Sequence, residues 1–158
     1  MTLRQAAQER PELHLDAGEV LIEQEQPAGR LFVLESGTVL VERDAIAVAR
    51  IDTPGAVFGE MSILLGTPAT ATVRCQTPCV LRVADDPVSF FSMHPEAALD
   101  LARVAAGRVD ALTRYLVDVK QQYAELDGHL GMLDTVLAAL THQQSPRTRP
   151  GSVRDPEG

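Results

Sequence analysis

The chain has 158 residues and a formal net charge of -8 at pH 7. This acidic balance argues against a nucleic-acid surface, because such a surface needs a basic patch to neutralise phosphates. The hydrophobic fraction is 45%, but aromatic residues make up only 4% and tryptophan is absent, so any core must be aliphatic. A chain of this length fits one domain with appendages.

Nothing in the sequence points to a membrane or to export. No apolar run approaches the roughly 18 residues of a membrane-spanning helix, and residues 1–10 lack the apolar core of a signal peptide. We therefore expect a cytoplasmic protein with no membrane association.

The first two thirds of the chain read as β-structure. Residues 3–9 predict a short helix that is ended by Pro11, and short β-type runs broken by turn residues then follow from residue 13 to about residue 84. The runs are 20–22, 31–34, 38–41, 47–51, 71–73 and 79–83. Short strands with regular turns are typical of sandwiches and jelly rolls, so we expect a mainly β fold, a jelly-roll β-barrel.

Residues 58–73 form the most informative motif. The sequence reads F-G-E-M-S-I-L-L-G-T-P-A-T-A-T-V, and it resembles the phosphate-binding cassette of cyclic nucleotide-binding domains. The residues on that pattern are Phe58, Gly59, Glu60, Ser62, Ile63, Gly66, Pro68, Ala71, Thr72 and Val73. Turn glycines at 18, 37 and 55 extend the resemblance over roughly residues 13 to 95. The arginine position of the family pattern holds Ala69.

The chemistry of this motif suits an anionic ligand. A short helix after Gly59 would present free backbone N–H groups, and glycine allows close approach to the backbone. The resemblance implies that Glu60 accepts a hydrogen bond from the ribose 2′-OH. It also implies cyclic AMP or cyclic GMP as the ligand, with no other cofactor. The predicted ligand-binding residues are Phe58, Gly59, Glu60, Met61, Ser62, Thr70, Ala71 and Thr72.

Ala69 weakens this prediction. An arginine there would make a charge-assisted hydrogen bond to the phosphate, worth roughly 1.5–3 kcal/mol, and a methyl group cannot replace it. Thr70 and Thr72 offer hydroxyls but no charge. Either Arg74 or Arg30 could substitute, or both are solvated surface arginines; the sequence leaves these alternatives open.

The remaining reactive side chains do not predict a metal site or a catalytic site. Cys75 and Cys79 are separated by Gln76-Thr77-Pro78, and a zinc site would need histidines that are scattered without ligand spacing. We expect two free thiols at a strand-turn-strand junction, since a hairpin disulfide is disfavoured in a reducing compartment. No metal site and no catalytic residue is predicted.

A heptad seam follows the β-rich region. Residues spaced alternately by four and three are Ala105, Val109, Leu112, Leu116, Val119, Tyr123, Leu126, Leu130, Leu133, Leu137 and Leu140. This pattern favours a parallel coiled coil that joins two identical chains, and the residues from Leu112 onward are the predicted dimerisation residues. The alternative is a hinge at Gly128 or Gly131, with the second half folding back as a separate helix.

These observations divide the chain into three parts. Residues 1–95 are the cyclic nucleotide-binding-like barrel, 96–142 the helical dimerisation segment, and 143–158, rich in proline and polar residues, a disordered tail. In relatives such as catabolite-activator-type regulators, ligand binding moves the helix after the barrel. Here no DNA-binding domain is recognised, so we expect a free-standing regulatory module.

Three functions are weighed. The first is a homodimeric sensor that binds a cyclic nucleotide or related anionic ligand weakly or atypically, and signals through its helix to a protein effector. The second is a degenerate barrel that no longer binds ligand and serves dimerisation and protein interaction. The third, a cupin-type enzyme, needs clustered histidine and carboxylate ligands on the strands, and His14 is the only histidine in the β-type region from residue 13 to about 84. We therefore expect no enzymatic activity.

Overall fold

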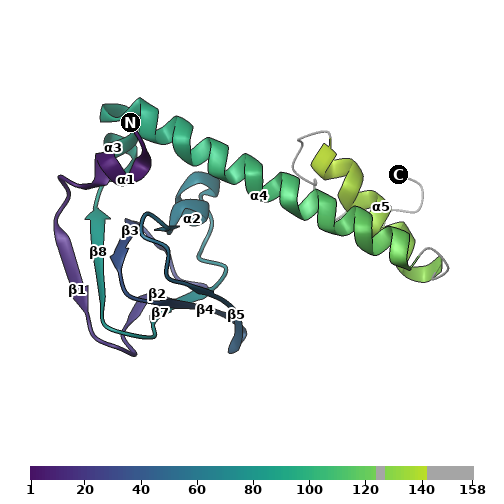
Figure 1. The fold of residues 1–158 in the computed structure, drawn as a ribbon, viewed down its shortest axis with the longest axis horizontal. Coiled ribbons are helices and arrows are strands. Elements are labelled where there is room, and N and C mark those ends of the chain that lie inside the picture. The colour runs from purple at the N-terminus through teal and green to yellow at the C-terminus, as the bar shows by residue number, and fades with distance from the viewer. Residues whose placement is uncertain (124–126, 142–158) are drawn as a thin grey trace. The chain divides into compact units, whose positions relative to one another are not determined.

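The structure is a computed structural model that describes residues 1–123 and 127–141; the side chains of residues 127–130 are outside the description. The chain divides into two compact units, Met1–Leu101 and Ala102–Gly158. Figure 1 shows the elements in chain order. Their bounds are α1 Leu3–Ala7, β1 Glu12–Leu15, β2 Val20–Ile22, β3 Leu31–Ser36, β4 Val39–Arg43, β5 Ile46–Ile51, β6 Val57–Phe58, α2 Glu60–Leu65, β7 Thr72–Cys75, β8 Cys79–Ala84, α3 Pro87–Met93, α4 Pro95–Gln122 and α5 Asp127–Thr141.

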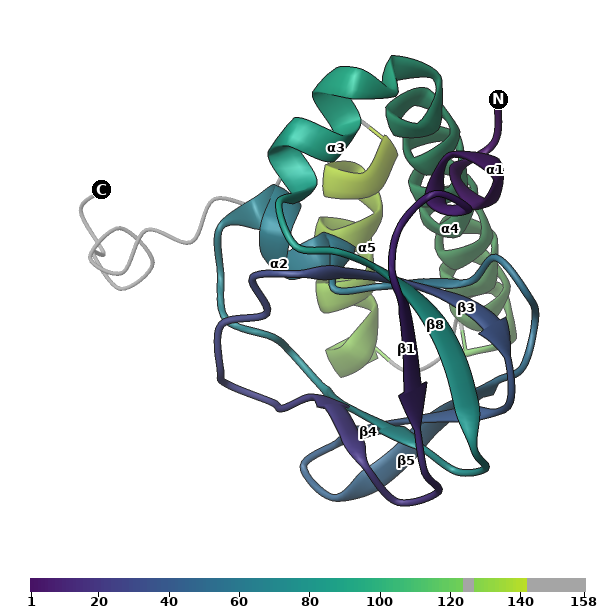
Figure 2. The same ribbon diagram turned by 90° about the vertical axis from the view of Figure 1, so that its left-hand side faces the viewer.

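The first unit is built from two antiparallel sheets, which Figure 2 shows in one view. One sheet has the strand order β1-β8-β3-β6 and the other the order β2-β7-β4-β5. The mainly β, jelly-roll-like fold predicted from the sequence is thus confirmed. The described strands form two separate sheets rather than one closed barrel, because β7 and β8 pair in different sheets although only residues 76–78 separate them.

Strand β3 separates two apolar cores. Because side chains alternate across a strand, Phe32 and Leu34 enter one buried cluster while Leu31 and Val33 enter another. The first cluster includes residues of both sheets, such as Val39 and Leu81. The second joins β3 to helices α1, α3 and the start of α4. The unbroken apolar run of β3 is therefore explained by burial on both faces.

Helix α1 is fixed at both its start and its side. Thr2 caps it: the Thr2 hydroxyl accepts from the Gln5 amide at 3.1 Å, and the Gln5 side chain accepts from the Thr2 amide at 2.8 Å. The Leu3 amide also donates to the Asp100 carboxylate at 2.9 Å, which ties α1 to the first turns of α4. The helix ends at Ala7, earlier than the predicted residue 9.

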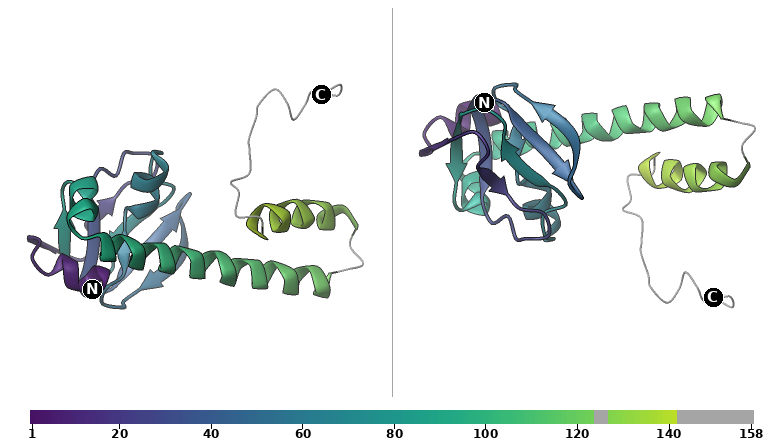
Figure 3. Two further views of the ribbon diagram at one scale, coloured as in Figure 1. Left: turned by 90° about the horizontal axis from the view of Figure 1, so that it is seen from above. Right: turned by 90° about the horizontal axis from the view of Figure 1, so that it is seen from below.

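The second unit contains most of α4 and all of α5. Helix α4 ends at Gln122 and α5 begins at Asp127, so the helix is not continuous along the whole heptad seam. The break comes before Gly128 and Gly131, and both of these glycines lie within α5. An ion pair between Lys120 and Asp134 joins the two helices, and α5 runs back beside the end of α4 in the views of Figure 3. The folded-back alternative thus describes this unit better than a single long helix.

Candidate functional site

The cassette residues gather at helix α2. Gly59 precedes α2 with a φ of +94°, and a Cβ atom added there would lie 2.5 Å from the Arg30 carbonyl oxygen. Only glycine fits this close approach to the backbone before β3. Gly66 ends the helix with a φ of +66°, and its amide donates to the Ser62 carbonyl oxygen. The predicted short helix after Gly59 is therefore present.

Glu60 is the first residue of α2 and is only 9% exposed. Among the described residues it is the one polar or charged side chain in the buried set. A carboxylate held in this way beside Gly59 is suited to accept hydroxyl hydrogen bonds. The preceding Phe58 is buried in the core between the sheets, whereas Met61 is exposed. Phe58 therefore positions the cassette rather than exposing a surface to ligand.

Ala69 faces the interior. Its side chain is 6% exposed and belongs to the buried cluster that contains Ile22 and Phe32. Its amide donates to the Gln26 carbonyl oxygen at 2.9 Å, and its carbonyl oxygen accepts from the Glu25 amide at 2.8 Å. Ala69 is thus an apolar contact that is fixed to the loop after β2.

Of the three hydroxyl side chains predicted to bind ligand, two hold the segment together. The Ser62 hydroxyl donates to the Thr67 carbonyl oxygen. The Thr72 hydroxyl accepts from the Gln24 amide at 3.0 Å, and it keeps its own proton for a second bond. Thr70 is exposed and Ala71 is half-buried. The hydroxyls therefore contribute mainly to the shape of the cassette.

The two arginines considered as substitutes make other contacts. Arg74 Nε lies 3.1 Å from Glu42 Oε1, and Arg74 Nη1 donates to the Gly18 carbonyl oxygen at 3.2 Å. Arg30 Nη1 lies 3.8 Å from Asp85 Oδ1, and its guanidinium stands 5.1 Å from the centre of the Phe32 ring. The contacts of Arg74 hold its side chain on the sheet that contains β2, β7 and β4. Arg30 adjoins the cassette through its backbone, because its carbonyl oxygen lies next to Gly59.

A hollow of about 330 Å³ adjoins the cassette. Its lining residues come from the loop after β2 and from α2 and its C-terminal turn: Pro27, Ala28, Gly29, Ser62, Ile63, Gly66, Thr67 and Pro68. None of these lining residues carries a formal charge. The sequence gave no sign that residues 27–29, between the predicted runs 20–22 and 31–34, face the cassette. The backbone bonds of Ala69 to Glu25 and Gln26 bring the two together.

The predicted dimerisation residues lie in the second unit. Leu112 is 47% exposed and Tyr123 is also exposed, while Leu116 and Val119 are half-buried. Leu133, Leu137 and Leu140 are half-buried on α5. Leu126 and the side chain of Leu130 lie outside the described residues. Every residue from 102 to 112 is exposed, in contrast to the half-buried leucines of α5.

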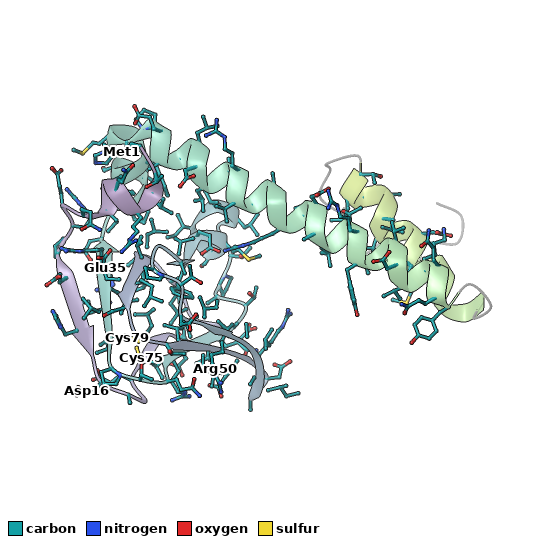
Figure 4. The ribbon with its side chains drawn as sticks, in the orientation of Figure 1. Met1, Asp16, Glu35, Arg50, Cys75 and Cys79 are labelled. Atoms are coloured by element: carbon teal, nitrogen blue, oxygen red, sulfur yellow. The ribbon has the colours of Figure 1, made fainter. Side chains whose placement is uncertain are left out.

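The two cysteines are free and buried, and Figure 4 labels them side by side between the sheets. Burial, together with a hydrogen bond and a charge interaction with Cys79, raises the pKa of the Cys75 thiol to about 12. Cys79 Sγ donates to the carbonyl oxygens of Thr77, at 3.2 Å, and of Thr38, at 3.4 Å. A thiol that stays protonated is a poor nucleophile, so Cys75 is suited to packing rather than chemistry.

The surroundings hold neither a metal cluster nor a membrane helix within the described ranges. No group of three or more histidine, cysteine, aspartate or glutamate residues there is placed to hold a metal ion. No helix in those ranges is both long enough and apolar enough to cross a bilayer.

Comparison with known proteins identifies the fold. Residues 12–87 match the family model of the cyclic nucleotide-binding domain. The cAMP-binding acyltransferase from Mycobacterium smegmatis is 31% identical with a TM-score of 0.55, over 68% of this chain and 35% of that chain. The N-terminal domain of a transcriptional regulator from Streptomyces coelicolor is 27% identical with a TM-score of 0.53, over 70% of this chain and 81% of that one.

Among curated proteins, Glutaminase 2 from Bradyrhizobium diazoefficiens is 35% identical over 116 residues, which are 65% of this chain and 18% of that protein. The chain thus spans less than a fifth of this relative. The enzymes among the relatives match through a part of their length only. The segment 12–87 of this chain therefore carries the fold of the cyclic nucleotide-binding domain.

Proposed function

We propose that this chain is a regulatory module that binds a cyclic nucleotide or a related anionic ligand at the α2 cassette, with weak or atypical affinity. One observation carries the proposal: Gly59, in its left-handed conformation, directly precedes the buried carboxylate of Glu60 at the start of α2. The family match over residues 12–87 and the cAMP-binding acyltransferase relative support the same ligand class.

Ala69 sets the expected strength. A charge-assisted hydrogen bond to phosphate contributes about 1.5–3 kcal/mol, so its loss weakens binding by about one to two factors of ten. Since the alanine methyl is buried among apolar side chains, no charged group is supplied from this position. Weak binding follows from this substitution rather than from loss of the rest of the cassette.

Calorimetric titration with cyclic AMP and cyclic GMP tests the binding step. The native chain should give measurable heat at high ligand concentration, and Ala69→Arg should bind about tenfold more tightly or better. Thr70→Arg is the matched control, because it adds the same charge at the exposed neighbouring position.

Thermal unfolding of both variants separates a change in the site from a loss of fold, since Ala69 is buried. Equal affinity of the native chain and the two folded variants would exclude a cyclic nucleotide site at the cassette.

The second part of the proposal is signalling through a homodimer. Residues 102–112 of α4 are exposed, and Val104, Val109 and Leu112 are large apolar side chains among them. An apolar stripe on a helix is stable when a partner covers it, and a second copy of the same helix fits the heptad spacing. Ligand occupancy would then reach a protein effector through this helix.

Sedimentation of Leu112→Lys tests the dimer. A lysine in the seam would be desolvated, so the dimer dissociation constant should rise by about tenfold or more. Ala111→Lys, one residue away from the seam and also exposed, should leave it unchanged. If the native chain and both variants are all monomers, or if all three form dimers with the same dissociation constant, dimerisation through this seam is refuted.

A second function is supported by the same cassette. Ala69 lies in the core, and its backbone is hydrogen-bonded to Glu25 and Gln26. This part of the cassette therefore already has its partners within the chain. This arrangement fits a barrel that no longer binds ligand and serves dimerisation and protein interaction. Absence of heat in the titration, together with an intact dimer in sedimentation, would favour this function.

A further inference from the structure

The backbone of Arg30 adjoins the cassette. Its carbonyl oxygen would lie 2.5 Å from a Cβ atom added to Gly59, and Ile22 Cδ1 would lie 3.6 Å from the same atom. Gly59 directly precedes Glu60, so the backbone of Arg30 lies beside the start of the cassette. In the sequence Arg30 follows residues 27–29, which line the hollow. Arg30 therefore borders both the cassette and the hollow.

The side chain of Arg30 lies on the inner face of β3. Arg30 and Phe32 are two residues apart, and such residues share one face of an extended chain. The Arg30 guanidinium carbon is 5.1 Å from the centre of the Phe32 ring. Phe32 belongs to the buried cluster that contains Ala69, and it pairs across the sheet with Phe58, the residue before Gly59. The charge of Arg30 is thus on the Ala69 side of the sheet.

Asp85 holds this guanidinium only loosely. Arg30 Nη1 is 3.8 Å from Asp85 Oδ1, which is longer than the roughly 2.7–3.2 Å of an N–H···O hydrogen bond. The two side chains are 51% and 75% exposed. Exposed pairs of this kind contribute little, because water and salt screen both charges. Arg30 can therefore turn its N–H groups to another anion at small cost.

The other candidate cation, Arg74, is held more firmly. Arg74 Nε is 3.1 Å from Glu42 Oε1, and the Glu42 side chain is 23% exposed. Arg74 Nη1 also donates to the Gly18 carbonyl oxygen at 3.2 Å. To bind a phosphate, Arg74 would have to give up both contacts and leave the half-buried Glu42 carboxylate without this cation. Of the two arginines, Arg30 is the one whose charge is available.

We infer that Arg30 provides the positive charge for the phosphate of the bound ligand, an inference that rests on the proposed function. Position 69 holds an alanine in the core, and none of the residues that line the hollow carries a formal charge. An anion near the buried Glu60 carboxylate is repelled unless a cation offsets that charge. A guanidinium can do so with two parallel N–H donors, which match two oxygens of a phosphate. Arg30 thereby exchanges the exposed Asp85 carboxylate for the ligand phosphate.

This role determines which part of the ligand Arg30 recognises. Cyclic AMP and adenosine share the base and the ribose, but only cyclic AMP carries the charged phosphate. Arg30 should therefore increase the affinity for cyclic AMP and leave the affinity for adenosine unchanged. A residue that merely maintained the fold would affect both ligands alike.

Calorimetric titration of the full chain with cyclic AMP and with adenosine tests the inference. The native chain should bind cyclic AMP about tenfold more tightly than adenosine, and in Arg30→Gln this ratio should fall to about one. Arg30→Lys retains the charge but loses the paired donors, so its ratio should be intermediate. Arg74→Gln is the matched control and should retain the native ratio, because Glu42 already pairs with Arg74.

The outcomes separate this inference from the proposed function. An unchanged ratio in folded Arg30→Gln, equal losses for the two ligands, or a ratio that falls only in Arg74→Gln would overturn the role of Arg30, while the cyclic nucleotide site would stand. Equal affinities of the native chain for the two ligands would also overturn that role. A native chain that binds neither ligand would overturn both the inference and the proposed function. Thermal unfolding verifies that each variant is folded, and the exposed Arg30 side chain should contribute little to stability.

Discussion

The two units differ in where they place similar aliphatic side chains. In the first unit Leu34, Val39 and Leu81 have no exposed surface, because they lie in the cluster that residues of both sheets form. In the second unit residues 102–112 are all exposed. A sheet needs a second layer to bury its apolar face, and the first unit supplies that layer from its own chain. Exposure of residues 102–112 is the observation on which the proposed dimer rests.

Truncation of one leucine in each unit should show this difference most strongly. Leu34→Ala leaves a cavity in the core and should lower the free energy of unfolding by about 2–5 kcal/mol. Leu112→Ala, measured at low protein concentration, should lower it by less than about 1 kcal/mol because the side chain is already exposed. Urea unfolding measures both. Equal losses would mean that the second unit buries its own seam.

The two ends of α2 test how tightly the first unit is packed around the cassette. Gly59→Ala combines a left-handed residue with a Cβ placed 2.5 Å from the Arg30 oxygen, and should cost about 3 kcal/mol. Gly66→Ala has a left-handed residue but open space around it, and should cost about 1–2 kcal/mol. Thermal unfolding compares them. If the order were reversed, the contact of Gly59 with Arg30 would not constrain the fold.

Alkaline pH should weaken the first unit through Cys75. The folded pKa of this thiol is raised from 9.0 to about 12, so the unfolded chain loses the proton first. The stability is complete below pH 9 and falls as the pH rises toward 12, by about 1 kcal/mol per pH unit. Cys75→Val should unfold with a flatter pH dependence above pH 9. Parallel pH profiles of the two proteins would exclude this thiol as the cause.

The smallest expected effect concerns the clamp on the β4–β5 hairpin. Gln24→Ala removes the two side-chain hydrogen bonds to Asp44 and should lower the free energy of unfolding by about 1 kcal/mol. Hydrogen exchange at the tip of the hairpin should rise, while α4 stays unaffected. Gln26→Ala is the control on the same loop, since Gln26 binds Ala69 through its backbone. Equal exchange in the two variants would mean that the hairpin does not depend on this clamp.

Local sequence signals predicted much of the fold and the short helix after Gly59. Strand runs at 20–22 and 79–83 agree closely with β2 and β8, and the glycines at 18, 37, 55, 59 and 66 all adopt positive φ. The two-residue strand β6 and the helix α3 were not predicted. Strand β6 exists only through its pairing with β3, and α3 through the burial of Phe90 against the second core.

The sequence by itself determined the β-rich fold, the glycine-bounded helix α2 and the aliphatic seam, because alternation, turn residues and helical spacing are local properties. Only the tertiary structure decided that Ala69 lies in the core beside Ile22, that Arg74 binds Glu42, and that the seam breaks between Gln122 and Asp127. Each of the first two depends on residues more than thirty positions apart in the chain. Such pairings follow from how the sheets register against each other, and no local pattern encodes that register.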